Sequence, residues 1–78
     1  MFNVVLPSLG EGVEKVIVVD WSVREGDMVR PEDDLMEIST DKAIFNVPSP
    51  QQGRLKKILC AAGEEICVGQ NIAVIEPV

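Results

Sequence analysis

The sequence of 78 residues contains no histidine and no tyrosine. Histidine is the commonest general base and the commonest metal ligand in proteins, so its absence removes the usual side chain for either chemistry. None of the serines has a histidine that could activate it as a nucleophile. We therefore expect a chain that is not an enzyme in its own right and that has no metal site.

Cysteine is also scarce, with Cys60 and Cys67 as the only two. Two thiols in a chain of this length are too few for the disulfide framework of a small secreted domain. A zinc site would need two more ligands, and there is no histidine to supply them. We interpret both cysteines as small, reduced side chains, which implies a reducing compartment.

Cations are in the minority: seven Lys and Arg stand against thirteen Asp and Glu, giving a net charge of −6. This balance argues against nucleic acid as a partner, because a phosphate backbone requires clustered positive charge. No apolar run approaches the roughly 18 residues of a membrane-spanning helix, and the N-terminus does not resemble a signal peptide, so we expect no membrane partner. The acidic run Glu32-Asp33-Asp34 brings no further ligands and is interpreted as a solvated surface rather than a calcium site.

The apolar residues occur in short runs rich in β-branched side chains, and glycine or proline separates these runs. No run is long enough, with the helical spacing i, i+3, i+4, i+7, to predict a helix. Short strands with turn signals between them are typical of an all-β sandwich or barrel, and the length allows a single domain over residues 1–78. The predicted strands include residues 4–6, 16–19, 35–38, 44–47, 55–59 and 72–75.

An internal repeat relates two halves of the chain. A shift of 37 positions places apolar residues on apolar residues and glycine on glycine. Neither half could bury enough surface alone, so we expect two similar β halves packed about a pseudo-twofold axis, with a β-bulge at the same place in each. The repeat also predicts a buried Cys60 and a more exposed Cys67. The matched pairs are Val18 and Leu55, Trp21 and Ile58, Val23 and Cys60, Gly26 and Gly63, Val29 and Ile66, Leu35 and Ile72, and Ile38 and Ile75.

The turn between the strands at 35–39 and 44–47 consists of Thr40, Asp41, Lys42 and Ala43. It lacks the Asn-Gly or Asp-Gly pair of the primed hairpin turns and fits a type I turn, which tolerates ordinary side chains. Asp41 is a common turn residue that can accept hydrogen bonds from nearby backbone N–H groups. Lys42 has no comparable role in forming the turn, and we expect its side chain to project from the tip of the hairpin.

Several motifs stand in a fixed order from residue 6 to about residue 75. They are the opening LPSLGEG, the segments VDWSVREGDMV and EISTDKAIFNVPSP, and the pair Gly63 and Gly69 in the second half. Together they resemble the lipoyl domain of a dihydrolipoyl acyltransferase from a 2-oxo acid dehydrogenase complex, in the biotinyl/lipoyl carrier family. The resemblance implies a flattened β-barrel of two four-stranded antiparallel sheets, with the modified lysine at a hairpin tip and the chain termini at the far end.

By this resemblance, Lys42 carries lipoic acid in amide linkage, and the domain is a swinging-arm carrier of acyl groups and reducing equivalents. The implied partners are a lipoate ligase or lipoyl transferase, a thiamine-diphosphate-dependent 2-oxo acid decarboxylase, an acyltransferase core and a dihydrolipoyl dehydrogenase. The parent chain would be a dihydrolipoyl acyltransferase. The implied compartment is the bacterial cytoplasm, or the mitochondrial matrix in a eukaryote.

The resemblance also points to residues through which partners recognise the carrier. These are Asp41 and Ala43 on either side of the lysine, together with Gly10, Glu11 and Gly12 in a surface loop near it. Each has a simpler interpretation as well, because Asp41 is a good turn residue and the glycines provide backbone freedom.

Two alternatives stay open at the level of sequence. A biotinyl carrier domain shares the barrel and the hairpin lysine, but its lysine has methionines on both sides, where this sequence has Asp41 and Ala43. An unmodified lipoyl-like barrel, as in membrane-fusion adaptors, would lack the Asp-Lys-Ala turn. Pyruvate, 2-oxoglutarate and branched-chain complexes all use domains of this kind, so the 2-oxo acid also stays open.

Overall fold

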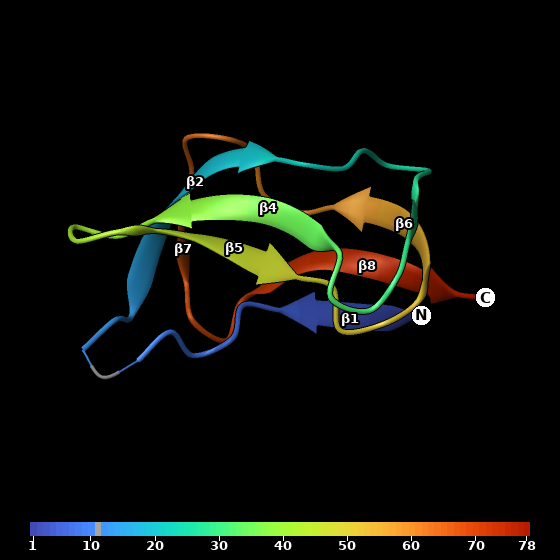
Figure 1. Ribbon diagram of the computed structural model, residues 1–78, viewed down its shortest axis with the longest axis horizontal. Coiled ribbons are helices and arrows are strands. Elements are labelled where there is room, and N and C mark those ends of the chain that lie inside the picture. The colour runs from blue at the N-terminus through green and yellow to red at the C-terminus, as the bar shows by residue number, and fades with distance from the viewer. Residues whose placement is uncertain (11) are drawn as a thin grey trace.

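The computed structural model describes residues 1–10 and 12–78, which form eight β-strands and, within that part of the chain, no helix (Figure 1). The strands make two four-stranded antiparallel sheets, in the orders β1-β8-β6-β3 and β5-β4-β2-β7. The predicted all-β architecture is therefore confirmed. The strands are β1 Phe2–Val5, β2 Lys15–Trp21, β3 Met28–Val29, β4 Asp34–Ser39, β5 Ile44–Pro48, β6 Gly53–Ile58, β7 Glu65–Cys67 and β8 Asn71–Pro77.

Alternating side chains fill the space between the two sheets. In β2, Val16 and Val18 are buried whereas Ile17 and Val19 are exposed, the period of two expected of a strand with one face on a core. The other strands also turn side chains inward, although β5 buries only Val47 and both β4 and β8 bury two consecutive residues. Together they supply a core made almost entirely of aliphatic side chains. Its members are Val4, Leu6, Val16, Val18, Val29, Leu35, Met36, Ile38, Val47, Leu55, Cys60, Ile66, Ile72, Ala73 and Ile75.

A pseudo-twofold axis exchanges the two sheets, with β1 equivalent to β5, β2 to β6, β3 to β7 and β4 to β8. Equivalent hydrogen bonds have equal lengths: the backbone N–H of Gly26 donates to the Leu55 carbonyl at 2.7 Å, and that of Gly63 donates to the Val18 carbonyl at 2.7 Å. The ladder also shifts register immediately after Val18 in β2 and after Leu55 in β6. The predicted repeat and the bulge in each half are confirmed.

The equivalence of β1 and β5 does not follow the 37-residue shift. Phe2 of β1 pairs with Ile75 and Phe45 of β5 pairs with Ile38, so these strands are offset by 43 positions, the difference between 45 and 2. The offset is larger because residues 6–14 connect β1 to β2, whereas only residues 49–52 connect β5 to β6. The β1–β2 loop therefore breaks the pseudo-symmetry, because its equivalent between β5 and β6 is shorter.

The β4–β5 hairpin lies at one end of the molecule, and both chain termini lie at the other (Figure 1). The longest dimension is 35 Å, against 21 and 17 Å for the other two. Under the pseudo-symmetry, the hairpin corresponds to the place where β8 ends and β1 begins. The described residues include no helix that could span a membrane.

Candidate functional site

The tip of the β4–β5 hairpin is the candidate site. Ser39 pairs with Ile44 at the end of the ladder, and the backbone N–H of Thr40 donates to the Ala43 carbonyl at 2.9 Å across the turn. Glu32 is the one non-glycine residue with positive φ in the described part of the chain. The tip is therefore not a primed turn, since primed turns need positive φ, and this agrees with the sequence prediction.

The side chain of Thr40 fastens the tip. Its Oγ1 accepts hydrogen bonds from the backbone N–H groups of Lys42 and Ala43 and donates to the Ala43 carbonyl, each at 3.2 Å. A hydroxyl group has one donor and two acceptor positions, so these contacts use its whole capacity. The sequence points to Asp41 and not to Thr40 for this role. The signal that could have identified Thr40 is the tendency of Ser and Thr hydroxyls to bond N–H groups two or three residues further along.

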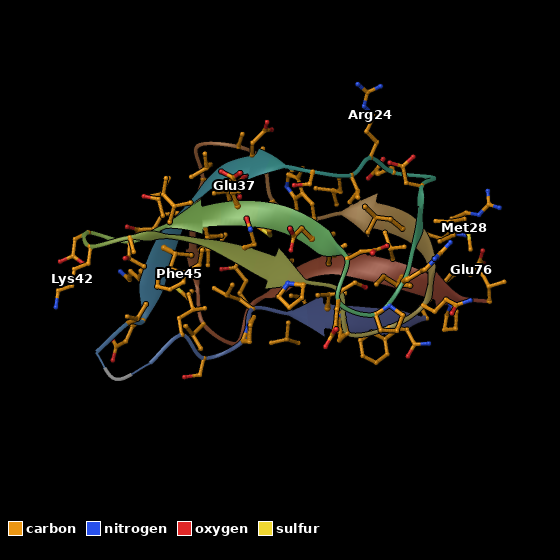
Figure 2. The ribbon with its side chains drawn as sticks, in the orientation of Figure 1. Arg24, Met28, Glu37, Lys42, Phe45 and Glu76 are labelled. Carbon is orange, nitrogen blue, oxygen red and sulfur yellow. The ribbon has the colours of Figure 1, made fainter. Side chains whose placement is uncertain are left out.

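Lys42 is exposed and points away from the barrel, beyond the ends of β4 and β5 (Figure 2). The ion pairs of residues 1–10 and 12–78 join Lys15 to Glu65 and Lys56 to Glu76, so the Lys42 amine takes part in neither. An amine at the end of a flexible four-carbon stem, clear of the protein surface, is accessible to a partner enzyme. This geometry agrees with the expected projection of Lys42 into solvent.

Asp41 and Ala43 are both exposed beside Lys42. Within the described residues, the side-chain hydrogen bonds of the tip come from Thr40 and the neighbouring Ser39, and none involves the Asp41 carboxylate. The carboxylate is thus not used by the turn. A part for Asp41 and Ala43 in recognition stays a prediction.

The β1–β2 loop lies at the same end of the molecule as the hairpin (Figure 1). Gly10 and Gly12 are exposed, with φ of 124° and 82°, and a Cβ added to either would meet no atom within 4 Å. Backbone conformation rather than lack of space therefore explains both glycines. Glu11 lies outside the described residues. The recognition role expected of Gly10, Glu11 and Gly12 stays a prediction.

The two cysteines and the acidic run were the other candidates in the sequence. Cys60 is buried and Cys67 is exposed, as the repeat predicts, and both are free thiols. Burial, and to a smaller extent the charge of Glu64, raises the pKa of the Cys60 thiol. In the acidic run, Asp33 accepts a hydrogen bond from the backbone N–H of Arg30 at 2.9 Å. In the described part of the chain, no three His, Cys, Asp or Glu residues gather in a way that could hold a metal ion.

A family model described as biotin-requiring enzyme matches residues 3–75. The chain is 39% identical over 70 residues to the dihydrolipoyllysine-residue succinyltransferase component of the 2-oxoglutarate dehydrogenase complex of Rickettsia bellii, covering 90% of this chain and 18% of that protein. It is 33% identical over 75 residues to the dihydrolipoyllysine-residue acetyltransferase component of the pyruvate dehydrogenase complex of Staphylococcus aureus, covering 96% and 17%. The chain thus spans less than a fifth of the length of these relatives.

The fold is similar to the solution structure of the lipoyl domain of the 2-oxoglutarate dehydrogenase complex from Azotobacter vinelandii. The TM-score is 0.75 at 20% sequence identity, and the match covers 97% of this chain and 96% of that one. At this identity the likeness concerns the fold, and it confirms the architecture of two four-stranded sheets. Since the family match extends over residues 3–75, the chain belongs to the biotinyl/lipoyl carrier family and has the fold of a lipoyl domain.

Proposed function

We propose that residues 1–78 are a lipoyl carrier domain in which Lys42 is joined by an amide bond to lipoic acid. The observation that carries the proposal is the position of Lys42, exposed at the tip of a hairpin in a chain of the biotinyl/lipoyl carrier family. Relatives named for dihydrolipoyllysine favour lipoic acid over biotin. The neighbours Asp41 and Ala43 also favour lipoic acid, because in biotinyl domains methionines stand on both sides of the lysine.

Attachment of the lipoyl group makes defined demands on the hairpin. In a ligase or transferase, the deprotonated Nζ of Lys42 attacks the carbonyl carbon of an activated lipoyl group, the activating group leaves with its bonding electrons, and the nitrogen loses a proton. The enzyme must receive the amine in one geometry, since misplacement of a nucleophile slows its reaction. Thr40 contributes here, because its hydroxyl holds the backbone of Lys42 and Ala43.

Lipoic acid, when bound, supplies a dithiolane that takes up an acyl group together with two electrons and later gives up both. The part of the chain itself is placement. The hairpin keeps the attachment point clear of the barrel, and the lysine stem lets it move. A tethered group meets each enzyme at high effective concentration, so successive transfers occur within one assembly. In this proposal the domain has no turnover of its own.

The proposed partners follow from this role. They are a lipoate ligase or lipoyl transferase, a thiamine-diphosphate-dependent 2-oxo acid decarboxylase, an acyltransferase core and a dihydrolipoyl dehydrogenase. The relatives are acyltransferase components about five times longer than this chain, so we propose a dihydrolipoyl acyltransferase as the parent protein. The proposed site of action is where these enzymes meet, the bacterial cytoplasm or the mitochondrial matrix.

Expression of the domain with a lipoate ligase and lipoic acid, and separately with a biotin ligase and biotin, tests the proposal. Intact mass and peptide mapping should show one lipoyl group on Lys42 and no biotin. Lys42→Arg should remain folded and unmodified, and the control Lys57→Arg should be modified like the wild type. Biotinylation of Lys42 would favour a biotinyl carrier domain. Absence of any modification would favour an unmodified lipoyl-like barrel, and lipoylation of Lys42→Arg would show that the attachment site is another residue.

A further inference from the structure

The pseudo-twofold symmetry provides a comparison within the molecule. We call β5-β4-β2-β7 the hairpin sheet and β1-β8-β6-β3 the opposite sheet; each packs one face on the common core and turns the other outward. Equivalent positions on the two outer faces have the same place in the backbone. A difference between their side chains is therefore not a requirement of the fold, and it calls for another explanation.

Two positions of β2 distinguish the outer face of the hairpin sheet from that of the opposite sheet. Ile17 and Val19 of β2 are 40% and 41% exposed. The equivalent residues of β6, 37 positions later, are Arg54 and Lys56, both exposed. The fold thus accepts long charged side chains at these two places, as expected for a solvated face of a sheet. In β2, however, both positions are occupied by aliphatic side chains.

A further exposed apolar residue, Ile44, lies at the base of the hairpin. Ile17 pairs with Ser39 of β4, and Ser39 pairs with Ile44 of β5, which is 64% exposed. Residues directly opposite in antiparallel strands share a face, so Ile17, Ser39 and Ile44 form one row across three strands. Ile44 is two residues from Lys42. An enzyme that approaches the tip from this side covers the row.

The two sheets also carry opposite charge. In the strands of the hairpin sheet, four carboxylates stand against one cation, a net charge of −3. In the opposite sheet, three cations stand against one carboxylate, a net charge of +2. The charged residues are Asp20, Asp34, Glu37, Glu65 and Lys15 in the first, and Arg54, Lys56, Lys57 and Glu76 in the second.

Two of these carboxylates stand in direct opposition. Asp20 of β2 pairs with Glu37 of β4, whose side chain lies on the outer face (Figure 2). Like charges directly opposite in a sheet are destabilising. A surface with basic side chains would relieve this repulsion on docking, and apolar side chains beside them would meet Ile17 and Ile44.

We propose that the outer face of the hairpin sheet, centred on Ile17, Val19 and Ile44, is the docking surface for the 2-oxo acid decarboxylase, which meets it with an apolar patch bordered by Lys and Arg. The proposal rests on the proposed function, since it assumes that Lys42 is lipoylated. Amide formation removes the positive charge of Lys42, so with Asp41 included the hairpin sheet changes from −3 to −4. Attraction to a basic surface is therefore stronger after modification than before it.

The test uses the lipoylated domain and a purified thiamine-diphosphate-dependent 2-oxo acid decarboxylase, chosen as the one that acylates the wild type with the lowest KM. The variant Ile17→Arg/Val19→Lys introduces the residues that the opposite sheet carries at the equivalent positions, so the fold should tolerate them. The matched control is Arg54→Gln/Lys56→Gln. We expect the first variant to be lipoylated normally and its KM for reductive acylation to rise about tenfold or more, with the control unchanged.

Two further readouts separate docking from chemistry. In an NMR titration of the labelled, lipoylated domain with the decarboxylase alone, the amide signals of Ile17, Val19 and Ile44 should shift or broaden. The KM of the wild type should also rise with ionic strength, because salt screens the attraction.

Specific results would overturn the docking surface. An unchanged KM in the Ile17→Arg/Val19→Lys variant would do so, as would signal changes confined to the tip. Slower lipoylation of that variant with normal acylation afterwards would show that the face serves the ligase instead. Failure of the proposed function has a different signature, because Lys42 would then lack the lipoyl mass in the wild type as well.

Discussion

Replacement of Thr40 by valine tests whether one hydroxyl holds the turn at the tip of the β4–β5 hairpin. Valine has nearly the same shape, so the change removes the three contacts of Oγ1 and little else. The turn is exposed and the contacts are 3.2 Å long, so water replaces much of what is lost. At the lower end of the usual range, about 0.5 kcal/mol for each of the two N–H groups, the loss is about 1 kcal/mol, or a Tm decrease of about 4–8 °C.

Thermal unfolding and amide hydrogen exchange measure this effect. The backbone N–H groups of Lys42 and Ala43 should exchange faster in Thr40→Val, while core amides change only as far as global stability does. The kcat/KM of the lipoate ligase should fall, because the amine is presented in more conformations. Thr40→Ser keeps the hydroxyl and should restore both properties. Equal exchange rates for Lys42 and Ala43 in Thr40→Val and the wild type would refute the reasoning.

Three other substitutions have defined outcomes. Gly53→Ala should destabilise the domain by roughly 1–3 kcal/mol in urea denaturation, because the added Cβ would overlap the backbone carbonyl oxygen of Glu76 in β8; a wild-type midpoint would contradict this. Glu32→Gly should stabilise it by a few tenths to about 1 kcal/mol, since Glu32 has a φ of 72° and its symmetry equivalent is a glycine; a lower Tm would count against strain there. The pKa of the Cys60 thiol is raised in the folded state, so its contribution to the free energy of unfolding is fully present below the unfolded pKa, near 9.0, and is lost as the pH rises above that value. In Cys60→Val the loss of stability at high pH should be smaller. Equal profiles of Tm against pH for the variant and the wild type would exclude the thiol as the source of that loss.

Much of the barrel could be predicted from particular residues. The six longer strands overlap the predicted apolar runs, although Leu6 and Leu59 of those runs lie just beyond the ends of β1 and β6. The pairs Val18 with Leu55 and Leu35 with Ile72 identified two equivalent halves. Burial of Cys60 and exposure of Cys67 followed from the same alignment. These predictions succeeded because a core position constrains residue type strongly, so that a repeated core leaves a repeated pattern.

Other features left too little signal in the sequence. β3 and β7 span only two and three residues, too few for an alternating pattern. The equivalence of Phe2 and Phe45 was hidden by the longer β1–β2 loop, which changes the spacing from 37 to 43 positions. The row formed by Ile17, Ser39 and Ile44 depends on strand pairing, and a single sequence does not specify which strands are neighbours.

The separation of the hairpin from the chain ends has a mechanical consequence for the proposed carrier. A polypeptide tether joined to either terminus would pull at one pole of a body 35 Å long, while Lys42 occupies the other pole. The barrel is then a rigid body with a flexible tether at one end and the flexible lysine side chain at the other. A small rotation of the barrel about the tether moves the Lys42 amine over a large distance, so the length of the barrel adds to the length of the proposed lipoyl-lysine side chain.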